Sequence, residues 1–289
     1  MTKLTDIIAA ELAEPVDPRV SAMASAVAAQ HGSASMAVLF YGSCLREQQL
    51  DGLMLDFYLI VSDYRSAYPK RWLATANRLV PPNVFPFAYK GLAAKYAVLS
   101  LADFDALNRP SASTVSVWAR FAQPVRLVWV GVSEVAAHIT SAVAQASVTL
   151  AELAAPLTVG ASPDAIWRAG FALTYTCELR AEQVNRSGSI VDSDLDRYAR
   201  ISAALPPIAP MSRAAAERRW AALRRHGKLT SVVRLAKASL TFAGGIDYIA
   251  WKINRHAGTA IEIKPWQRRW PILGAITLVP KLFASGTIK

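Results

Sequence analysis

Two strongly apolar stretches separated by a Gly-Ser step constrain the fold of this chain more than any other feature. Residues 36 to 41 and 53 to 61 have the length and the β-branched and aromatic content of buried strands. The first stretch ends at Gly42 and Ser43, and the second carries one carboxylate, Asp56. The sequence therefore predicts two strands of one sheet, with a tight turn after the first strand and a carboxylate in the second.

The Gly-Ser turn and Asp56 together have the layout of a nucleotidyltransferase active site. Gly42 has no Cβ, so backbone N–H groups at the turn can approach a phosphate closely. Asp56 lies in so apolar a stretch that its burial without a cation or hydrogen-bond partners would be costly. Mg²⁺ on a nucleoside triphosphate would supply that cation, because it prefers oxygen ligands. The plainer interpretation is an ordinary turn and an edge-strand aspartate that faces water.

Further segments follow this turn in a recognisable order. They are residues 83 to 85 with Lys95 and Tyr96, residues 118 to 121, Tyr175 with Glu178 to Arg180, and residues 231 to 252. Together they resemble the mitochondrial-type phosphatidate cytidylyltransferases, the translocator assembly and maintenance family, which make CDP-diacylglycerol from CTP and phosphatidate. Two positions depart from the pattern. Cys44 replaces a second glycine of the turn, and Tyr58 stands where nucleotidyltransferases in general have a second carboxylate.

The resemblance implies a role for each of several residues. The expected catalytic residues are Asp56, Lys95 and Arg120, and the expected nucleotide-binding residues are Gly42, Ser43, Tyr96 and Lys237. Arg234 is a further candidate cation for the phosphates. Mg²⁺ is the expected cofactor, held by Asp56 and Asp63. These two are an odd number of residues apart, so on an ideal strand they would face opposite sides, and a bulge or an early strand end would be required.

Charge is concentrated at the C-terminal end of the chain. Residues 213 to 289 carry 15 Lys and Arg against three acidic residues, which accounts for essentially the whole net charge of +11. Within this region Trp266 and Trp270 flank two arginines at the start of an apolar run that prolines interrupt. That composition is typical of an interfacial membrane anchor that does not span the bilayer. We therefore expect an anionic membrane surface as partner and no nucleic acid, although a segment that folds back onto the protein is the alternative.

The architecture expected from the sequence is α/β (α+β) in three parts. They are a nucleotidyltransferase-like catalytic domain with a mixed sheet (1–133), a helical domain (134–227) and a basic amphipathic segment (228–289). Strands are expected at 36–41, 53–61, 95–100 and 125–131, and helices at 20–30, 69–79, 101–107, 134–155, 163–186 and 213–226. The acidic residues near the N-terminus and the presence of only two cysteines predict a bacterial cytoplasmic protein. The basic C-terminal segment predicts that it is peripheral on the inner face of the membrane.

The predicted function is transfer of CMP from CTP to phosphatidate. Two alternatives remain open at this stage. A soluble nucleotidyltransferase would use the same turn and aspartate on another phosphate or hydroxyl acceptor and would not need the basic C-terminal segment. A non-catalytic membrane or nucleic-acid adaptor on a degenerate fold is suggested by Tyr58. The sequence does not specify the oligomeric state.

Overall fold

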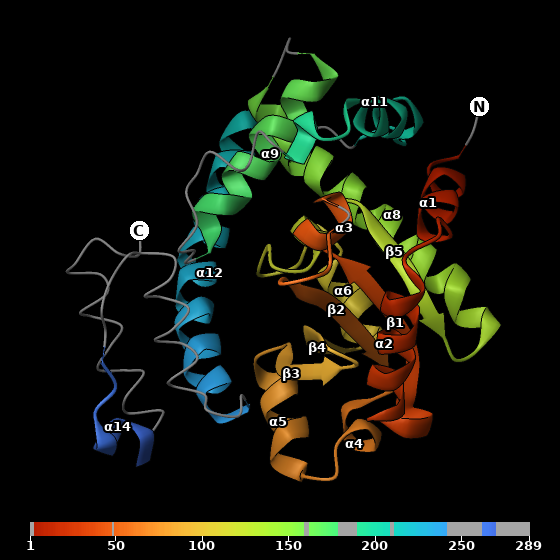
Figure 1. Ribbon diagram of the computed structural model, residues 1–289. Coiled ribbons are helices and arrows are strands. Elements are labelled where there is room, and N and C mark those ends of the chain that lie inside the picture. The colour runs from red at the N-terminus through yellow and green to blue at the C-terminus, as the bar shows by residue number, and fades with distance from the viewer. Residues whose placement is uncertain are drawn as a thin grey trace.

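A five-stranded mixed sheet with helices on both faces forms the centre of the protein (Figure 1). The computed structural model describes residues 3–47, 49–158, 162–178, 190–208, 211–241 and 262–269. The strands are β1 (Ser35–Tyr41), β2 (Met54–Val61), β3 (Asn83–Tyr89), β4 (Leu92–Ser100) and β5 (Val125–Val130). This confirms the mixed α/β class that the sequence predicts.

The strand order is β3-β4-β2-β1-β5. β2 and β4 run parallel, and every other neighbouring pair is antiparallel. The four strands expected from the sequence are present within a few residues, but β3 was not among them. Pro86 lies inside β3, and proline normally argues against a strand because it has no N–H to donate. β3 tolerates it as an edge strand, whose outer side needs no partner.

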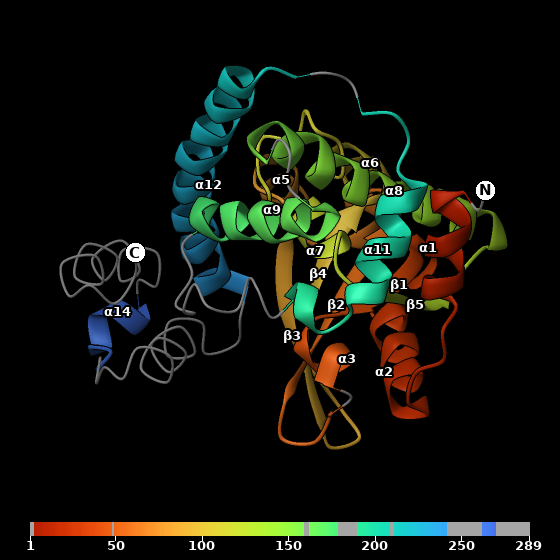
Figure 2. The same ribbon diagram turned by 90° about the horizontal axis from the view of Figure 1, so that it is seen from above.

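Period-two alternation divides the sheet into two faces. Tyr58, Ile60, Ala97 and Leu99 point to what we call the α8 face, and their neighbours in sequence point to the α2 face. The α8 face is covered by α1 (Leu4–Leu12), α6 (Leu101–Leu107), α7 (Trp118–Phe121) and α8 (Ser133–Ala154), and the α2 face by α2 (Pro18–Ala29), α4 (Tyr64–Ala67) and α5 (Arg71–Leu79). Figure 2 shows α8 and α2 on opposite sides of the sheet.

Further helices extend the α8 side of the molecule: α9 (Pro163–Cys177), α11 (Leu195–Ala204) and α12 (Arg213–Thr241). The remaining short elements are α3 (Ser43–Glu47), α14 (Pro265–Arg269) and 3₁₀ turns at Gly32–Ala34 and Ala155–Leu157. Residues of the sheet, α8, α9 and α12 share one hydrophobic core, which crosses the boundary expected at residue 134. α12 likewise runs through the boundary expected at residue 228.

A helix was expected over 163 to 186, and α9 covers Pro163–Cys177 of that range. Glu178 has extended backbone angles of φ −116° and ψ 152°, and residues 179–189 lie outside the described residues. Tyr175 and Glu178 therefore do not share a helix face. The close approach of α12 at this point accompanies the helix end, because a Cβ on Gly227 would lie 2.3 Å from the Cys177 carbonyl oxygen.

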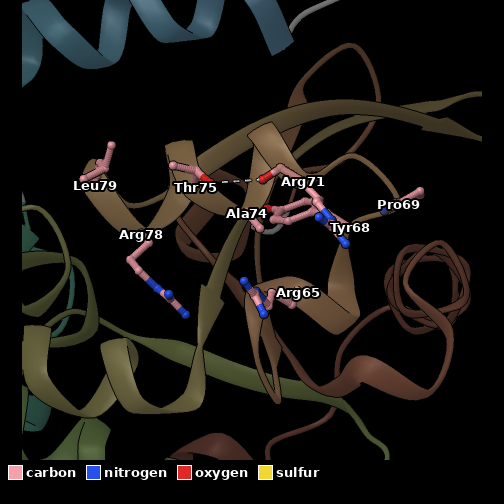
Figure 3. Close-up of a pocket in the computed structure, with 8 residues that line it drawn as sticks. All are labelled: Arg65, Tyr68, Pro69, Arg71, Ala74, Thr75, Arg78 and Leu79. Carbon is pink, nitrogen blue, oxygen red and sulfur yellow. Dashed lines mark hydrogen bonds between the residues drawn. The ribbon is translucent and has the colours of Figure 1, made fainter.

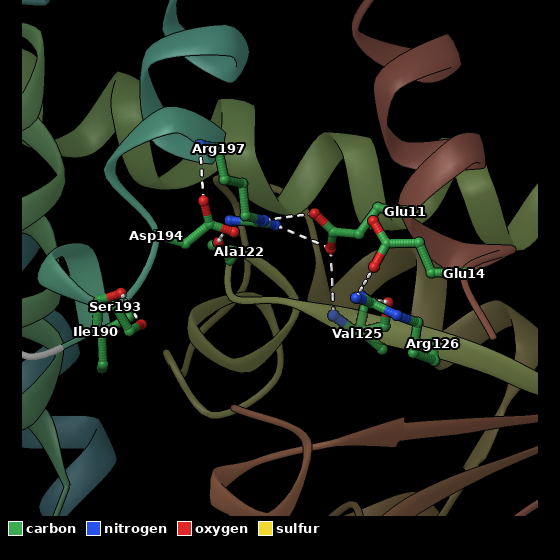
Figure 4. Close-up of polar contacts among 9 residues, drawn as sticks. All are labelled: Glu11, Glu14, Ala122, Val125, Arg126, Ile190, Ser193, Asp194 and Arg197. Atoms are coloured by element: carbon green, nitrogen blue, oxygen red, sulfur yellow. Dashed lines mark hydrogen bonds and ion pairs between the residues drawn. The ribbon is translucent and has the colours of Figure 1, made fainter. Parts of the chain in front are cut away.

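A buried ion pair attaches the N-terminal helix to α11 (Figure 4). Arg197 donates to both carboxylate oxygens of Glu11, at 2.5 and 3.1 Å, and to the Ala122 carbonyl at 3.0 Å. Glu11 also accepts the Val125 N–H at the start of β5. Burial alone would lower the pKa of Arg197, but the Glu11 carboxylate raises it above its usual value. Breaking such a pair by removing one partner typically destabilises a protein by about 3–5 kcal/mol.

No helix in the part of the chain that the structure describes combines the length and the apolarity needed to cross a membrane. The segment expected to act as a membrane anchor falls largely on residues 270–289, outside the described residues, and only its first few positions, in α14, are placed.

Candidate functional site

Gly42 ends β1 and lies directly against Asp56 of the neighbouring strand. Its φ of +95° belongs to the left-handed region, which side chains rarely adopt. A Cβ at this position would lie only 2.9 Å from Asp56 Oδ2. Glycine is therefore required twice here, by the turn and by the carboxylate. Ser43 follows as the first residue of α3, so the Gly-Ser turn and Asp56 are brought together as the sequence predicted.

A row of three polar side chains crosses the sheet next to this turn. Asp56 pairs in register with Tyr41 on β1 and with Lys95 on β4. Because paired residues on adjacent strands share a face, all three lie on the α8 face. Lys95 Nζ is 3.0 Å from Asp56 Oδ1, and the two side chains are 31% and 19% exposed. The pair is thus half-buried but accessible from one side, which a ligand-binding carboxylate requires.

Two arginines and a glutamate continue the charged surface toward the helices. Arg120 of α7 donates to the Ser116 carbonyl, and its Nη2 lies 3.8 Å from Glu178 Oε2. Arg234 of α12 approaches the other oxygen of Glu178 at 3.7 Å. The Glu178 side chain is only 8% exposed, so it sits between two guanidinium groups from different helices.

The charge of Arg120 interacts with that of Asp56. Burial would lower the pKa of Arg120, but the Glu178 carboxylate, then Tyr58, Tyr41 and Asp56, raise it well above its usual value. Tyr41 and Tyr58 are neutral, because burial raises the pKa of both phenols. Burial, partly offset by Glu178, lowers the pKa of Arg234. Lys95 therefore pairs with Asp56, and a firmly protonated Arg120 interacts with the charge of Asp56. This combination is suited to binding an anion next to a carboxylate-bound cation.

Lys237 lies near the start of β3. It donates to the carbonyls of Val80 and, at 2.8 Å, Pro82, while Arg234 Nε donates to the Pro81 carbonyl at 2.9 Å. Burial, with repulsion from Arg234, lowers the pKa of Lys237 to about 7. β3 begins opposite Val98, three residues beyond Lys95 on β4 and so roughly 10 Å further along the sheet. The structure therefore does not bring Lys237 to the Asp56 carboxylate.

Tyr96 points away from this site. As the neighbour of Lys95 in a strand, it projects to the α2 face, where its hydroxyl is 3.2 Å from His31 Nε2. His31 in turn contacts the Ala67 carbonyl through Nδ1. Burial raises the pKa of Tyr96 to about 12 and lowers that of His31. The adjacency of Lys95 and Tyr96 in sequence thus separates them in space.

Asp63 lies beyond the other end of β2. Its carboxylate accepts the N–H groups of Arg65 and Ser66 and, at 2.6 Å, the Ser66 hydroxyl, and so caps α4. These hydrogen bonds, the Ser66 hydroxyl first, lower its pKa. Seven strand residues span roughly 23 Å, so the structure does not bring Asp63 and Asp56 together at one ion. Among the described residues, no group of three or more His, Cys, Asp or Glu side chains is arranged to hold a metal.

Three residues at the site were not among the catalytic, nucleotide-binding or metal-binding residues expected from the sequence. Tyr41 lies on the same face as Asp56 because the two are paired across β1 and β2, and Tyr58 lies there because it is two residues after Asp56 on β2. The spacing of Tyr58 could have been read from the predicted strand. Glu178 entered only as part of a segment that carries the resemblance, and its position between two arginines depends on the fold of α9 against α12. No local sequence pattern would have predicted that contact.

Comparison with known proteins does not extend this description. No protein-family model matches the chain. No curated protein is significantly similar to it.

Proposed function

We propose that this protein is a Mg²⁺-dependent nucleotidyltransferase that transfers CMP from CTP to phosphatidate, giving CDP-diacylglycerol and pyrophosphate. The observation that carries the proposal is the contact of Gly42 with Asp56: a left-handed glycine at a strand end, with a carboxylate of the adjacent strand packed where its Cβ would be. The arrangement supports the proposal, because backbone N–H groups of such a turn can bind a phosphate and a carboxylate beside them can bind a metal.

The residues around this contact suit phosphoryl chemistry, which depends mainly on positioning and charge neutralisation. The triphosphate would lie over the turn at Gly42 and Ser43, with Lys95 and Arg120 beside it. A phosphate oxygen of the acceptor would attack the α-phosphorus of CTP, and the bond from that phosphorus to the bridging oxygen would break to release pyrophosphate. Because the attacking phosphate is already anionic, the reaction requires cations that reduce repulsion between the two anions rather than a strong base.

The site offers Mg²⁺ one protein carboxylate, that of Asp56. Mg²⁺ commonly binds through one or two carboxylates together with substrate phosphates, so Asp56 alone can supply the protein ligand. Bound Mg²⁺ would neutralise phosphate charge as the pyrophosphate leaves. Lys95, whose Nζ is 3.0 Å from Asp56 Oδ1, would contact phosphate oxygens beside the ion.

Phosphatidate is proposed as the acceptor for two reasons. The ordered segments of the sequence resemble phosphatidate cytidylyltransferases, and Arg120 and Arg234 supply two cations beside Glu178 for a second phosphate. A peripheral location on the cytoplasmic face of the membrane follows from this substrate and is part of the proposal.

The direct test is pyrophosphate release by the full chain from CTP and Mg²⁺, with and without detergent-dispersed phosphatidate. Release that requires both substrates, with CDP-diacylglycerol as the lipid product, is expected. If CTP binds but phosphatidate does not cause pyrophosphate release, the assignment of phosphatidate as acceptor is wrong, and the assignment to the nucleotidyltransferase class still holds. No binding of CTP would overturn the class.

A further inference from the structure

A basic hollow lies on the α2 side of the molecule, at α4 and α5, away from the Asp56 site. Its volume is about 460 Å³, within the usual range for ligand pockets. The lining residues are Arg65, Tyr68, Pro69, Arg71, Ala74, Thr75, Arg78 and Leu79 (Figure 3). Three of the eight are arginines and none is acidic, so the lining is positively charged, which favours an anion.

The three arginines are not engaged in ion pairs within the described part of the chain. The charge of Asp63 interacts with that of Arg65, but its carboxylate oxygens accept hydrogen bonds from the first turn of α4. In Figure 3 the side chains of Arg65 and Arg78 extend into the same region from α4 and α5. Guanidinium groups arranged in this way bind phosphate with several hydrogen bonds each.

Exposed apolar side chains adjoin the hollow. Leu79 is 75% exposed and Trp72 is 46% exposed, both on α5. A spacing of seven residues is nearly two helical turns, so Trp72 and Leu79 form one row along α5, and Arg71 and Arg78 form a second row beside it. Paired rows of tryptophan with leucine and of arginine are typical of a surface that enters the headgroup region of a membrane.

We propose that this α4–α5 face binds the phosphate headgroups of anionic phospholipids at a membrane surface. The arginines would contact lipid phosphates in the hollow, and Trp72 and Leu79 would enter the interfacial layer beside them. The inference does not rest on the proposed function, since its evidence comes from residues outside the Asp56 site and its test requires no nucleotide.

A local probe tests the proposal in the full chain. Cys44 and Cys177 are buried, so a Leu79→Cys variant offers a single exposed thiol for an environment-sensitive dye. Vesicles of phosphatidylcholine with phosphatidate or phosphatidylglycerol should shift the dye emission to shorter wavelength, and pure phosphatidylcholine should not. Vesicles that retain the protein without shifting the dye, or that fail to retain it at low salt, would overturn the proposal.

The arginines are tested by the double variant Arg71→Ala, Arg78→Ala, with Arg200→Ala as the matched control. Arg200 is exposed on α11, at the opposite end of the molecule from α4 and α5 in Figure 1. Each well-placed arginine strengthens binding to an anionic surface by about fivefold, so the double variant should bind anionic vesicles roughly twentyfold more weakly and lose the dye shift, while the control keeps both. Equal losses in both variants would contradict the proposal. The proposal would also be contradicted if a duplex oligonucleotide bound to the protein instead of the vesicles and its binding depended on the same arginines.

Discussion

The two ends of β2 each carry an aspartate, and the structure uses them differently. Asp56, near the start of the strand, lies against the backbone of Gly42 and pairs with Lys95. Asp63, just past the end, caps α4 and is exposed. The same side chain on the same segment thus serves a candidate binding site at one end and local helix formation at the other. The difference lies in the adjoining backbone, a left-handed glycine in one case and unpaired helix N–H groups in the other.

Among substitutions that test the different roles of Asp56 and Asp63, Gly42→Ala is expected to have the largest effect on activity. A Cβ would strain the backbone at φ +95° and displace the Asp56 carboxylate, which lies 2.9 Å from the Cβ position. We expect stability to fall by about 1–3 kcal/mol in denaturant titrations and phosphatidate-dependent pyrophosphate release to fall about a hundredfold.

Gly52→Ala is the matched control for that change. Gly52 also has positive φ, +75°, but its Cβ position is open. The control should share the backbone strain and keep its activity. Equal activity losses in the two variants would show that strain alone, rather than contact with Asp56, controls the site.

Lys95→Met removes the ammonium group that pairs with Asp56. Because Lys95 is partly exposed and a methionine keeps its packing, stability should change little, whereas pyrophosphate release should fall roughly tenfold to a hundredfold. Lys90→Met, on the exposed turn between β3 and β4, provides the comparison. Unchanged activity in Lys95→Met would remove Lys95 from the proposed site.

Asp63→Ala tests the capping end of β2. Loss of the cap should lower the melting temperature by roughly 2–4 °C and leave pyrophosphate release unchanged. Hydrogen bonds hold the folded-state pKa of Asp63 below its usual 3.8, so its stabilisation is complete above that pH and disappears as pH falls through the folded-state pKa. The difference between variant and parent should shrink accordingly in acid. An activity loss in this variant without a stability loss would contradict the capping role.

A pH-dependent effect is expected for Lys237, whose partners are carbonyls rather than a carboxylate. Burial lowers its pKa from 10.5 to about 7, so the unfolded chain binds the additional proton between those values. The free energy of unfolding of the parent should therefore rise with pH from about 7 to 10.5 relative to Lys237→Met. Denaturant titrations at several pH values measure this, and parallel pH profiles for the two proteins would contradict it.

Much of the sheet could be predicted from the sequence, because buried strands carry a strong local signal. Four strands and the Gly42–Asp56 neighbourhood follow from apolar stretches and a glycine at a strand end. β3 was not predicted, because the proline at position 86 argues against a strand there and only an edge strand tolerates it. The end of α9 at Cys177 and the approach of Glu178 to Arg120 and Arg234 depend on packing between segments distant in sequence, which no local pattern records.

Neighbouring residues also illustrate the limit of motif reasoning. Lys95 and Tyr96 form one motif in the sequence, but strand alternation places them on opposite faces of the sheet. Asp56 and Asp63 were paired as metal ligands because of the family resemblance, although their odd spacing argued against it, and the strand between them holds them apart. In both cases strand geometry, applied strictly, predicts the separation that the structure contains.

The most direct test of this account compares Asp56→Asn with Asp63→Asn in one assay of pyrophosphate release from CTP, Mg²⁺ and phosphatidate. Both substitutions remove one charge, and asparagine remains a good helix cap at residue 63. The account predicts a loss of at least about a hundredfold for Asp56→Asn and near-parental release for Asp63→Asn. Equal release by the two variants would contradict the assignment of the site to the Asp56 end of β2.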